Sequence, residues 1–354
     1  LAGDEPDEDT AMLAAELARL HFFAGDRSRG RERVEEALAI AERDRLPTVL
    51  SSALNTKALL LQPHYHEASA LIHYALTIAL EHNLTYDALR AYNNLAVINE
   101  SLDRADNEEP MMKEALELAR RHGDREWATR FTFALISEYK DSGRWDQALE
   151  LLRTFDQPLP LENAVSATDI LELLWERGLD EELAACLELT KVLTFDEANI
   201  QDRALAIDTE RMLATMDGRT ADAVEAAVAI IHASAGTGRE RDWLVAEALR
   251  TVTDSCLAVD DAPAPVLEAL AVSRSLLGVY PPRIVVCQVA RLEGMVAALQ
   301  GDPDAAVDRF GVALAAARSR RLVLWTAEIL RDYAFALLRD DRPDDAEPLS
   351  LIHI

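Results

Sequence analysis

Residues 301–317 read GDPDAAVDRFGVALAAA, and this stretch decides the fold because its pattern recurs along the chain. A Gly/Asp turn leads into a helical segment that carries small residues at fixed offsets. The same arrangement is found in GDRSRGRERVEEALAIA (25–41), GRWDQALELL (143–152) and GRTADAVEAAVAI (218–230). Repetition of one helical unit at a fixed period is typical of a solenoid, in which each repeat packs on its neighbours.

The residue that opens the second helix of each repeat can be aligned along the whole chain. The intervals between these positions are about 40 residues, except for one clearly shorter interval after Ala148. Apolar residues recur four and seven positions later, as in Val34 and Ala37, which makes the stripe that a packed helix buries. The aligned residues are Gly30, Ala68, Glu108, Ala148, Leu183, Ala223, Ala264, Ala306 and Ala346.

This pattern predicts an all-α, right-handed α-solenoid of about nine helix pairs with a period of about 40 residues. We expect residues 1–157 to form N-terminal repeats and residues 158–348 to form C-terminal repeats continuous with them. The short interval near Asp156 marks the change between the two. Residues 349–354 depart from the Ala-rich composition and are expected to be a non-native tail.

The composition narrows the classes of partner. The chain has 354 residues with 36 basic and 63 acidic side chains, a net charge of −27, which repels nucleic-acid phosphates and anionic lipid. We therefore expect no direct nucleic-acid or membrane partner. No signal peptide or membrane-spanning stretch is found, and Cys186, Cys256 and Cys287 are interpreted as buried thiols of a reducing cytosol, so a cytoplasmic location is expected.

The spacing resembles that of tetratricopeptide repeats, stretched from about 34 to about 40 residues. The segments ALNTKA (53–58), LRAYNNLA (89–96), ALELARRHGDREW (115–127) and SGRWDQALELL (142–152) are similar to the C-terminal repeat region of large bacterial signalling ATPases. These include class III cyclase proteins with an ATPase module and LuxR- and maltose-regulator-type transcription activators. The resemblance implies that catalysis or DNA binding lies elsewhere in a longer chain. The first residue is Leu1 rather than Met, and we expect the sequence to be a fragment.

Residues with catalytic or metal-binding chemistry are present, but their spacing does not assemble a site. Paired carboxylates such as Glu35 and Glu36 are expected on solvated helix faces, and His64, His66 and His73 lack a fourth ligand. No phosphate-binding G-x-x-x-x-G-K-[ST] loop is found. The sequence therefore predicts a protein that is not an enzyme, with no catalytic residues, no metal and no cofactor.

One group of side chains is a candidate for ligand binding. The resemblance to tetratricopeptide repeats implies that side chains before and after the small residue of each first helix point into a concave groove. Amides suit a peptide backbone and guanidinium groups suit carboxylates, so an acidic or carboxylate-bearing peptide is the expected ligand. The alternative is that these side chains hydrogen-bond to neighbouring helices. The candidate residues are Ser52, Asn55, Arg90, Asn93, Arg130 and Lys140.

These observations favour a non-enzymatic scaffold that binds a protein or effector. The expected partners are a protein or peptide and the upstream domain of the same full-length chain. The scaffold would be the regulatory C-terminal part of a signalling ATPase, a cyclase or a transcription regulator. The alternative is a stand-alone cytoplasmic receptor for a peptide signal.

Overall fold

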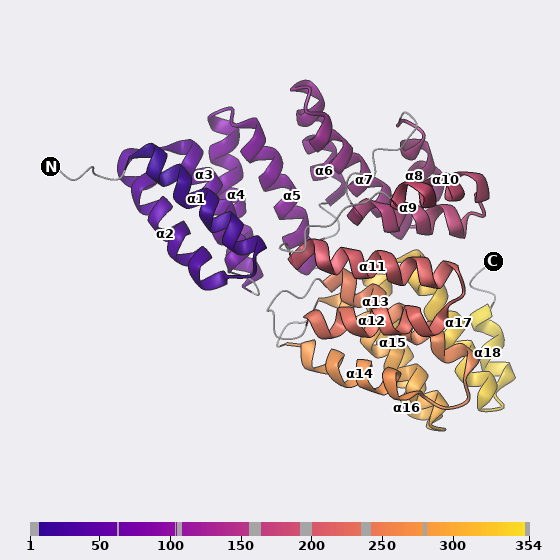
Figure 1. Cartoon of the computed structure of the whole chain (residues 1–354). Coiled ribbons are helices and arrows are strands. Elements are labelled where there is room, and N and C mark those ends of the chain that lie inside the picture. Colours follow the sequence, from indigo (N-terminus) through magenta and orange to yellow (C-terminus); the bar gives the residue numbers. More distant parts are fainter. Residues whose placement is uncertain are drawn as a thin grey trace. The chain divides into compact units, whose positions relative to one another are not determined.

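The computed structural model describes residues 7–61, 64–102, 104, 108–155, 164–191, 200–234, 242–278 and 282–350, apart from the side chains of 164–167, 200, 201, 242 and 350. Over these ranges the chain forms eighteen α-helices and one short 3₁₀ helix, with no strand (Figure 1). Neighbouring helices pack in sequence order. The predicted all-α solenoid of helix pairs is confirmed.

The chain divides into two compact units, and each is described by itself. Unit 1 comprises Leu1–Leu135 and Phe195–Arg203, and unit 2 comprises Ile136–Thr194 and Ala204–Ile354. The division therefore falls within α7 and α11. The predicted boundary at 157/158 lies outside the described residues, as do residues 351–354 of the predicted tail.

Unit 1 holds the first three helix pairs, with odd-numbered helices as first helices and even-numbered helices as second helices. First helices contact the first helices of the next pair, α1 on α3 and α3 on α5. The helices are α1 (Glu8–Phe23), α2 (Arg27–Asp44), α3 (Pro47–Leu60), α4 (Tyr65–Glu81), α5 (Thr85–Ser101), α6 (Glu108–Arg121) and the start of α7 (Arg125–Asp141).

Unit 2 continues the same alternation. Its first helices pack on one another, α13 on α15 and α15 on α17, and the second helix α12 packs on α14. After the end of α7 it contains α8 (Trp145–Leu152), α9 (Ala164–Glu176), α10 (Asp180–Thr190), most of α11 (Ile200–Met216), α12 (Thr220–Ser234), α13 (Asp242–Ser255), η2 (Cys256–Ala258), α14 (Ala264–Leu276), α15 (Arg283–Leu299), α16 (Pro303–Ser319), α17 (Val323–Arg339) and α18 (Pro343–Ser350).

The Gly/Asp turns act as helix boundaries for a local reason. Asp302 begins α16 by accepting a hydrogen bond from the backbone N–H of Ala305 at 3.1 Å, and Pro303 follows at the first helical position. Gly143 ends α7 with a φ of +75°, a conformation that strains residues with a Cβ. A Cβ at Gly143 would also lie 3.1 Å from Val323. Sequence and turn geometry thus agree on where the helices end.

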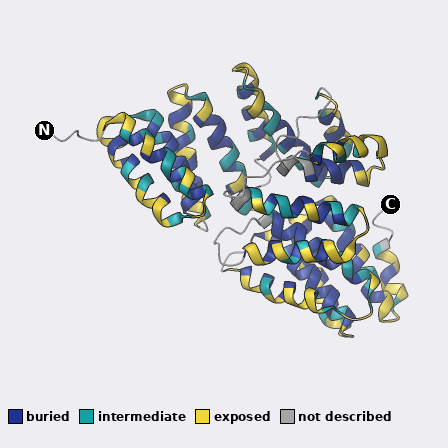
Figure 2. Cartoon of the chain, in the orientation of Figure 1, coloured by how far each residue is buried: buried dark blue, intermediate teal, exposed yellow. Residues whose placement is uncertain are grey.

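The aligned small residues let helices approach closely. Ala68, Ala148 and Ala306 are fully buried or nearly so, and a Cβ on Gly30 would lie 3.0 Å from Leu60. The helices carry both buried and exposed stretches along their surfaces (Figure 2). Burying apolar surface contributes about 25 cal/mol per Å². The small side chains bring the larger apolar residues of both helices into contact. The stripe read from the sequence is therefore the core of each pair.

The alignment is wrong in two helices. Leu183 of α10 is half-buried, and the buried residues there are Cys186 and Thr190. Ala264 of α14 is exposed, whereas Val266 is buried. The buried small residues of these helices are Cys186 and Ala269, which lie outside the aligned positions, so the sequence spacing misplaced the buried faces by two or three positions. With Cys186 in place of Leu183 as the aligned position, the short interval after Ala148 disappears and the spacing becomes regular.

No helix in the described ranges combines the length and apolar character that crossing a membrane requires.

Candidate functional site

The six predicted binding residues lie in both units. Ser52, Asn55, Arg90 and Asn93 lie in unit 1, together with Arg130 of the unit 1 part of α7. Lys140, at the end of α7, lies in unit 2.

Arg90 of α5 is buried and joins two first helices. Its guanidinium donates to the hydroxyl of Ser52 at 2.9 Å and to the hydroxyl of Thr56 at 2.6 Å, both on α3. Ser52 is also buried. These contacts match the alternative stated from the sequence, in which the side chains hydrogen-bond to a neighbouring helix. Arg90 therefore fixes α3 against α5 and offers little surface to a ligand.

The asparagines form a chain of amide hydrogen bonds. Asn93 donates to Asn94 at 3.4 Å, and Asn94 donates to the side-chain oxygen of the fully buried Asn55 at 2.7 Å. Asn93 and Asn94 are half-buried, so they form the accessible end of this chain. The Nδ2 group of Asn55 has no acceptor among the described residues. The sequence missed Asn94, which is adjacent to the predicted Asn93.

Arg130 lies on an aromatic surface near the start of α7. Its guanidinium carbon is 5.0 Å from the ring centroid of Trp127, and that ring meets Tyr86 of α5 edge-on at 6.2 Å. The Arg130 side chain remains 38% exposed. A guanidinium held over an indole ring keeps its charge at the surface while losing conformational freedom. Trp127 is itself buried.

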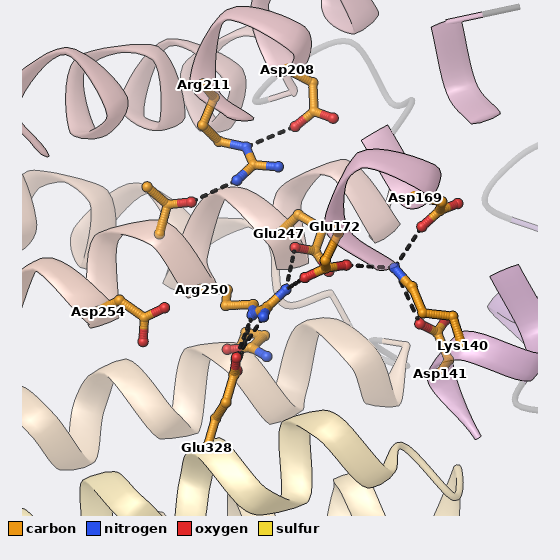
Figure 3. Close-up of polar contacts among 12 residues, drawn as sticks. Lys140, Asp141, Asp169, Glu172, Asp208, Arg211, Glu247, Arg250, Asp254 and Glu328 are labelled. Carbon is orange, nitrogen blue, oxygen red and sulfur yellow. Dashed lines mark hydrogen bonds and ion pairs between the residues drawn. The ribbon is translucent and has the colours of Figure 1, made fainter. Parts of the chain in front are cut away.

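Lys140 is 2% exposed, and acidic side chains surround it. Its ammonium group lies 2.6 Å from Asp169 and 2.5 Å from Glu172 on α9, and 3.5 Å from Asp141 (Figure 3). Burial disfavours the charged form of Lys140, but Asp169 and Glu172 outweigh burial and hold the pKa of Lys140 well above its usual value. Its charge is thus fully compensated from within unit 2.

The ion pairs continue to Arg250 of α13. Its guanidinium contacts the carboxylates of Glu172 and Glu247, and it approaches Glu328 of α17 within 2.5 Å (Figure 3). Glu172 therefore bridges Lys140 and Arg250. Burial raises the pKa of Glu172, but Arg250 and Lys140 more than offset burial, so the pKa of Glu172 is lowered.

Arg291 of α15 extends the network toward the next pairs. It is fully buried and lies 2.6 Å from Asp332, 3.0 Å from Glu328 and 2.6 Å from Asp254. Arg331 contacts Asp254 and Asp332 from the more exposed side. Because Glu328 accepts from both Arg250 and Arg291, one network of charges runs from α7 to α17 along the first helices.

Acidic side chains outnumber basic ones in the network that runs from α7 to α17. Among the described residues it includes eight acids and five cations. Burial raises the pKa of Glu247 to about 7, and the negative charge of Glu172 acts in the same direction. A protonated Glu247 reduces the excess of negative charge. The acids are Asp141, Asp169, Glu172, Asp208, Glu247, Asp254, Glu328 and Asp332, and the cations are Lys140, Arg211, Arg250, Arg291 and Arg331.

A repeat signal could have revealed this network from the sequence. Acid-x-x-Arg occurs at Asp208–Arg211 and again at Glu247–Arg250, and Gln288–Arg291 follows at the same place in the next repeat. The three arginines are thus separated by one repeat period each. Charged pairs three residues apart are common on exposed helices, so one such pair is uninformative. Their recurrence at the repeat period is the informative feature.

The two units thus offer different chemistry. In unit 2 the charged groups of the first helices pair with one another, which holds these helices in register. In unit 1 Asn93, Asn94 and Arg130 are partly exposed, and buried or aromatic neighbours hold them in place. In the part of the chain that the structure describes, no group of three or more His, Cys, Asp or Glu side chains is arranged to hold a metal ion.

The sequence matches no known protein-family model and no curated protein.

Proposed function

We propose that this chain is a non-enzymatic helix-repeat scaffold that binds a protein or peptide partner through the first helices of unit 1. The supporting observations are the partly exposed amides of Asn93 and Asn94 on α5, held by hydrogen bonds, and the partly exposed guanidinium of Arg130 on α7, held over Trp127. Amide and guanidinium groups that are already ordered lose less entropy on binding than mobile surface side chains do. Asn93 and Asn94 suit peptide amides, and Arg130 suits a carboxylate of the partner.

We further propose that the scaffold is the regulatory C-terminal part of a larger cytoplasmic signalling ATPase, cyclase or transcription regulator. This part of the proposal is supported by the resemblance of residues 89–96 and 115–127 to such repeat regions. Partner binding would change the packing between helix pairs and so act on the attached domain. Sequencing of the coding region upstream of Leu1 tests it, because a start codon a few codons upstream would contradict it.

The binding experiment must avoid the buried residues. Charge reversal at Arg90 would leave Ser52 and Thr56 without their donor and would disturb the fold as well as any ligand. Asn93→Ala with Arg130→Ala changes only partly exposed side chains. Thr77→Ala with Arg120→Ala, on the exposed faces of α4 and α6, is the matched control.

Short random peptides displayed on phage are selected against the immobilised chain and ranked by sequencing. We expect enrichment of acidic peptides that bind the wild type and the control variant and that lose about tenfold in affinity for the Asn93→Ala/Arg130→Ala variant. Equal binding to both variants, or no enrichment at all, would show that this surface is not the binding site.

A further inference from the structure

An apolar groove of about 440 Å³ lies between α8, α9 and α10 of unit 2. Its floor consists of the buried side chains of Leu149, Leu152, Leu174 and Cys186. A volume of this size is in the range that binds ligand side chains. The groove is separate from the polar surface of unit 1 to which the proposed function refers.

The groove lies beside a short second helix. α8 has 8 residues and ends at Leu152, whereas the second helices α12 and α16 have 15 and 17 residues. Leu152 and Arg153, at the end of α8, both line the groove. Leu179 and Leu189 are half-buried and Ala185 is exposed, so part of the apolar lining faces solvent.

The charge at the rim indicates the kind of partner. Glu181 and Glu182 line the groove from the first turn of α10, where Asp180 adds a third acid. Neither Glu181 nor Glu182 forms an ion pair with another residue of the described ranges. Arg153 is the single cation among the lining residues. The surroundings therefore favour a cationic group beside an apolar one.

We infer that this groove binds an amphipathic helix of a partner protein, with its leucine-type face on Leu179 and Leu189 and its basic residues against Glu181 and Glu182. Apolar anchors in a groove give such complexes most of their affinity, and the flanking charges select the partner.

Two neighbouring alanines of α10 provide a matched test. Ala184 and Ala185 are both exposed, but only Ala185 lines the groove. Ala185→Arg places a long cationic side chain in the groove, and Ala184→Arg adds the same charge beside it. Because both positions are exposed, neither variant disturbs the core. Circular dichroism and thermal unfolding confirm that both variants are folded.

The probes are two fluorescently labelled helical peptides with the same leucine face, one with lysine and one with glutamate on the other face. By fluorescence anisotropy we expect the lysine peptide to bind the wild-type chain, with an affinity about tenfold lower for Ala185→Arg and within about twofold of wild type for Ala184→Arg. The glutamate peptide should bind at least about tenfold more weakly than the lysine peptide.

A second pair of variants separates the groove from the general acidity of the chain. Glu181→Lys with Glu182→Lys should reduce the preference for the lysine peptide, whereas Asp304→Lys with Asp308→Lys, on α16 and away from the groove, should leave it unchanged. The inference is overturned if the wild type binds neither peptide, if Ala184→Arg and Ala185→Arg weaken binding equally, or if both lysine pairs have the same effect. A groove already filled by another segment of the chain would give the first of these results.

Discussion

Arg250 and Glu328 form a two-pronged ion pair across 78 residues of sequence, with Nε and Nη2 of the arginine 2.9 and 2.5 Å from Oε1 of the glutamate. Arg250 lies on α13 and Glu328 on α17, and α15 packs against both helices. The contact between Arg250 and Glu172 of α9 spans another 78 residues. Side chains from alternate first helices of unit 2 therefore meet and pair with one another. They fill the face of these helices on which the sequence predicted a ligand-binding groove.

Replacement of Arg250 tests how far unit 2 depends on these contacts. Arg250→Met removes the cation that Glu172, Glu247 and Glu328 share. Glu172 and Glu328 then keep only Lys140 and Arg291, and the buried Glu247 loses its ion-pair partner. We expect a loss of about 3 kcal/mol or more in the free energy of unfolding, measured by urea denaturation. Arg219→Met removes an exposed cation that pairs with Asp217 and Asp222, and its unfolding midpoint should match that of the wild type.

The fold was more predictable than the site, and the reason is physical. Where two helices pack closely, a small residue such as Ala68 or Ala306 lies at the contact. The position of the contact can therefore be predicted from the sequence of a single repeat. In α10 and α14 the buried small residues, Cys186 and Ala269, lie outside the aligned positions, and the prediction was wrong there. A buried charge such as Arg250 depends instead on partners two repeats away. The pattern within one repeat does not distinguish it from an exposed charge, as the prediction of Lys140 as a groove residue shows.

The candidate residues of unit 1 illustrate the same limit. The sequence placed Ser52 and Arg90 at one offset of successive first helices and Asn55 at another, and hydrogen bonds link α3 and α5 through them. Their burial could not be read from the repeat offset, because the offset gives the face of the helix and not the distance to the next helix. The partly exposed Asn93 and Arg130 were found by the same rule. Whether they bind a ligand stays a prediction.

Gly143→Ala should destabilise unit 2 for two separable reasons. The φ of +75° is unfavourable for alanine, and the added Cβ would lie 3.1 Å from Val323 at the start of α17. Gly218→Ala has a similar φ of +69° with no atom within 4 Å, so it measures the backbone cost alone. We expect about 1 kcal/mol for Gly218→Ala and a larger loss for Gly143→Ala in urea denaturation. Equal losses would show that Val323 moves aside freely.

Arg90→Met should weaken unit 1 without creating a large cavity. The variant removes the donor to Ser52 and Thr56, although Thr56 still donates to the backbone carbonyl of Ser52 at 3.1 Å. We expect a loss of about 1–3 kcal/mol in the free energy of unfolding. Arg29→Met, at a side chain that is 70% exposed, is the control. A stability equal to that of the control would mean that the α3–α5 contact does not depend on Arg90.

The protonation of Glu247 makes the stability of unit 2 depend on pH near neutrality. Burial raises the pKa of Glu247 from 4.5 to about 7. Between these values the folded state binds more protons than the unfolded state, so this group's contribution to stability falls as pH rises and levels off above pH 7. The pKa values of Glu172 and Asp254 are lowered, so their contribution to stability is lost only as the pH falls below the usual carboxyl range. These two groups therefore do not change the pH dependence of stability near neutrality.

Glu247→Gln isolates this effect. The carboxylate faces Arg250, Arg211 and Lys140 as well as Glu172, and Gln288 already occupies the matching position of the next repeat, so glutamine fits the site. We expect the free energy of unfolding, measured by urea denaturation, to fall between about pH 5.5 and about pH 8. The fall should be about 1–2 kcal/mol larger for the wild type than for Glu247→Gln. Burial together with Asp169, Glu172 and Glu247 also raises the pKa of Asp141, to about 8, which adds a larger pH dependence of the same sign to both proteins. Identical slopes for the two proteins would mean that Glu247 is ionised in the folded state throughout this range, balanced by Arg250 and Lys140.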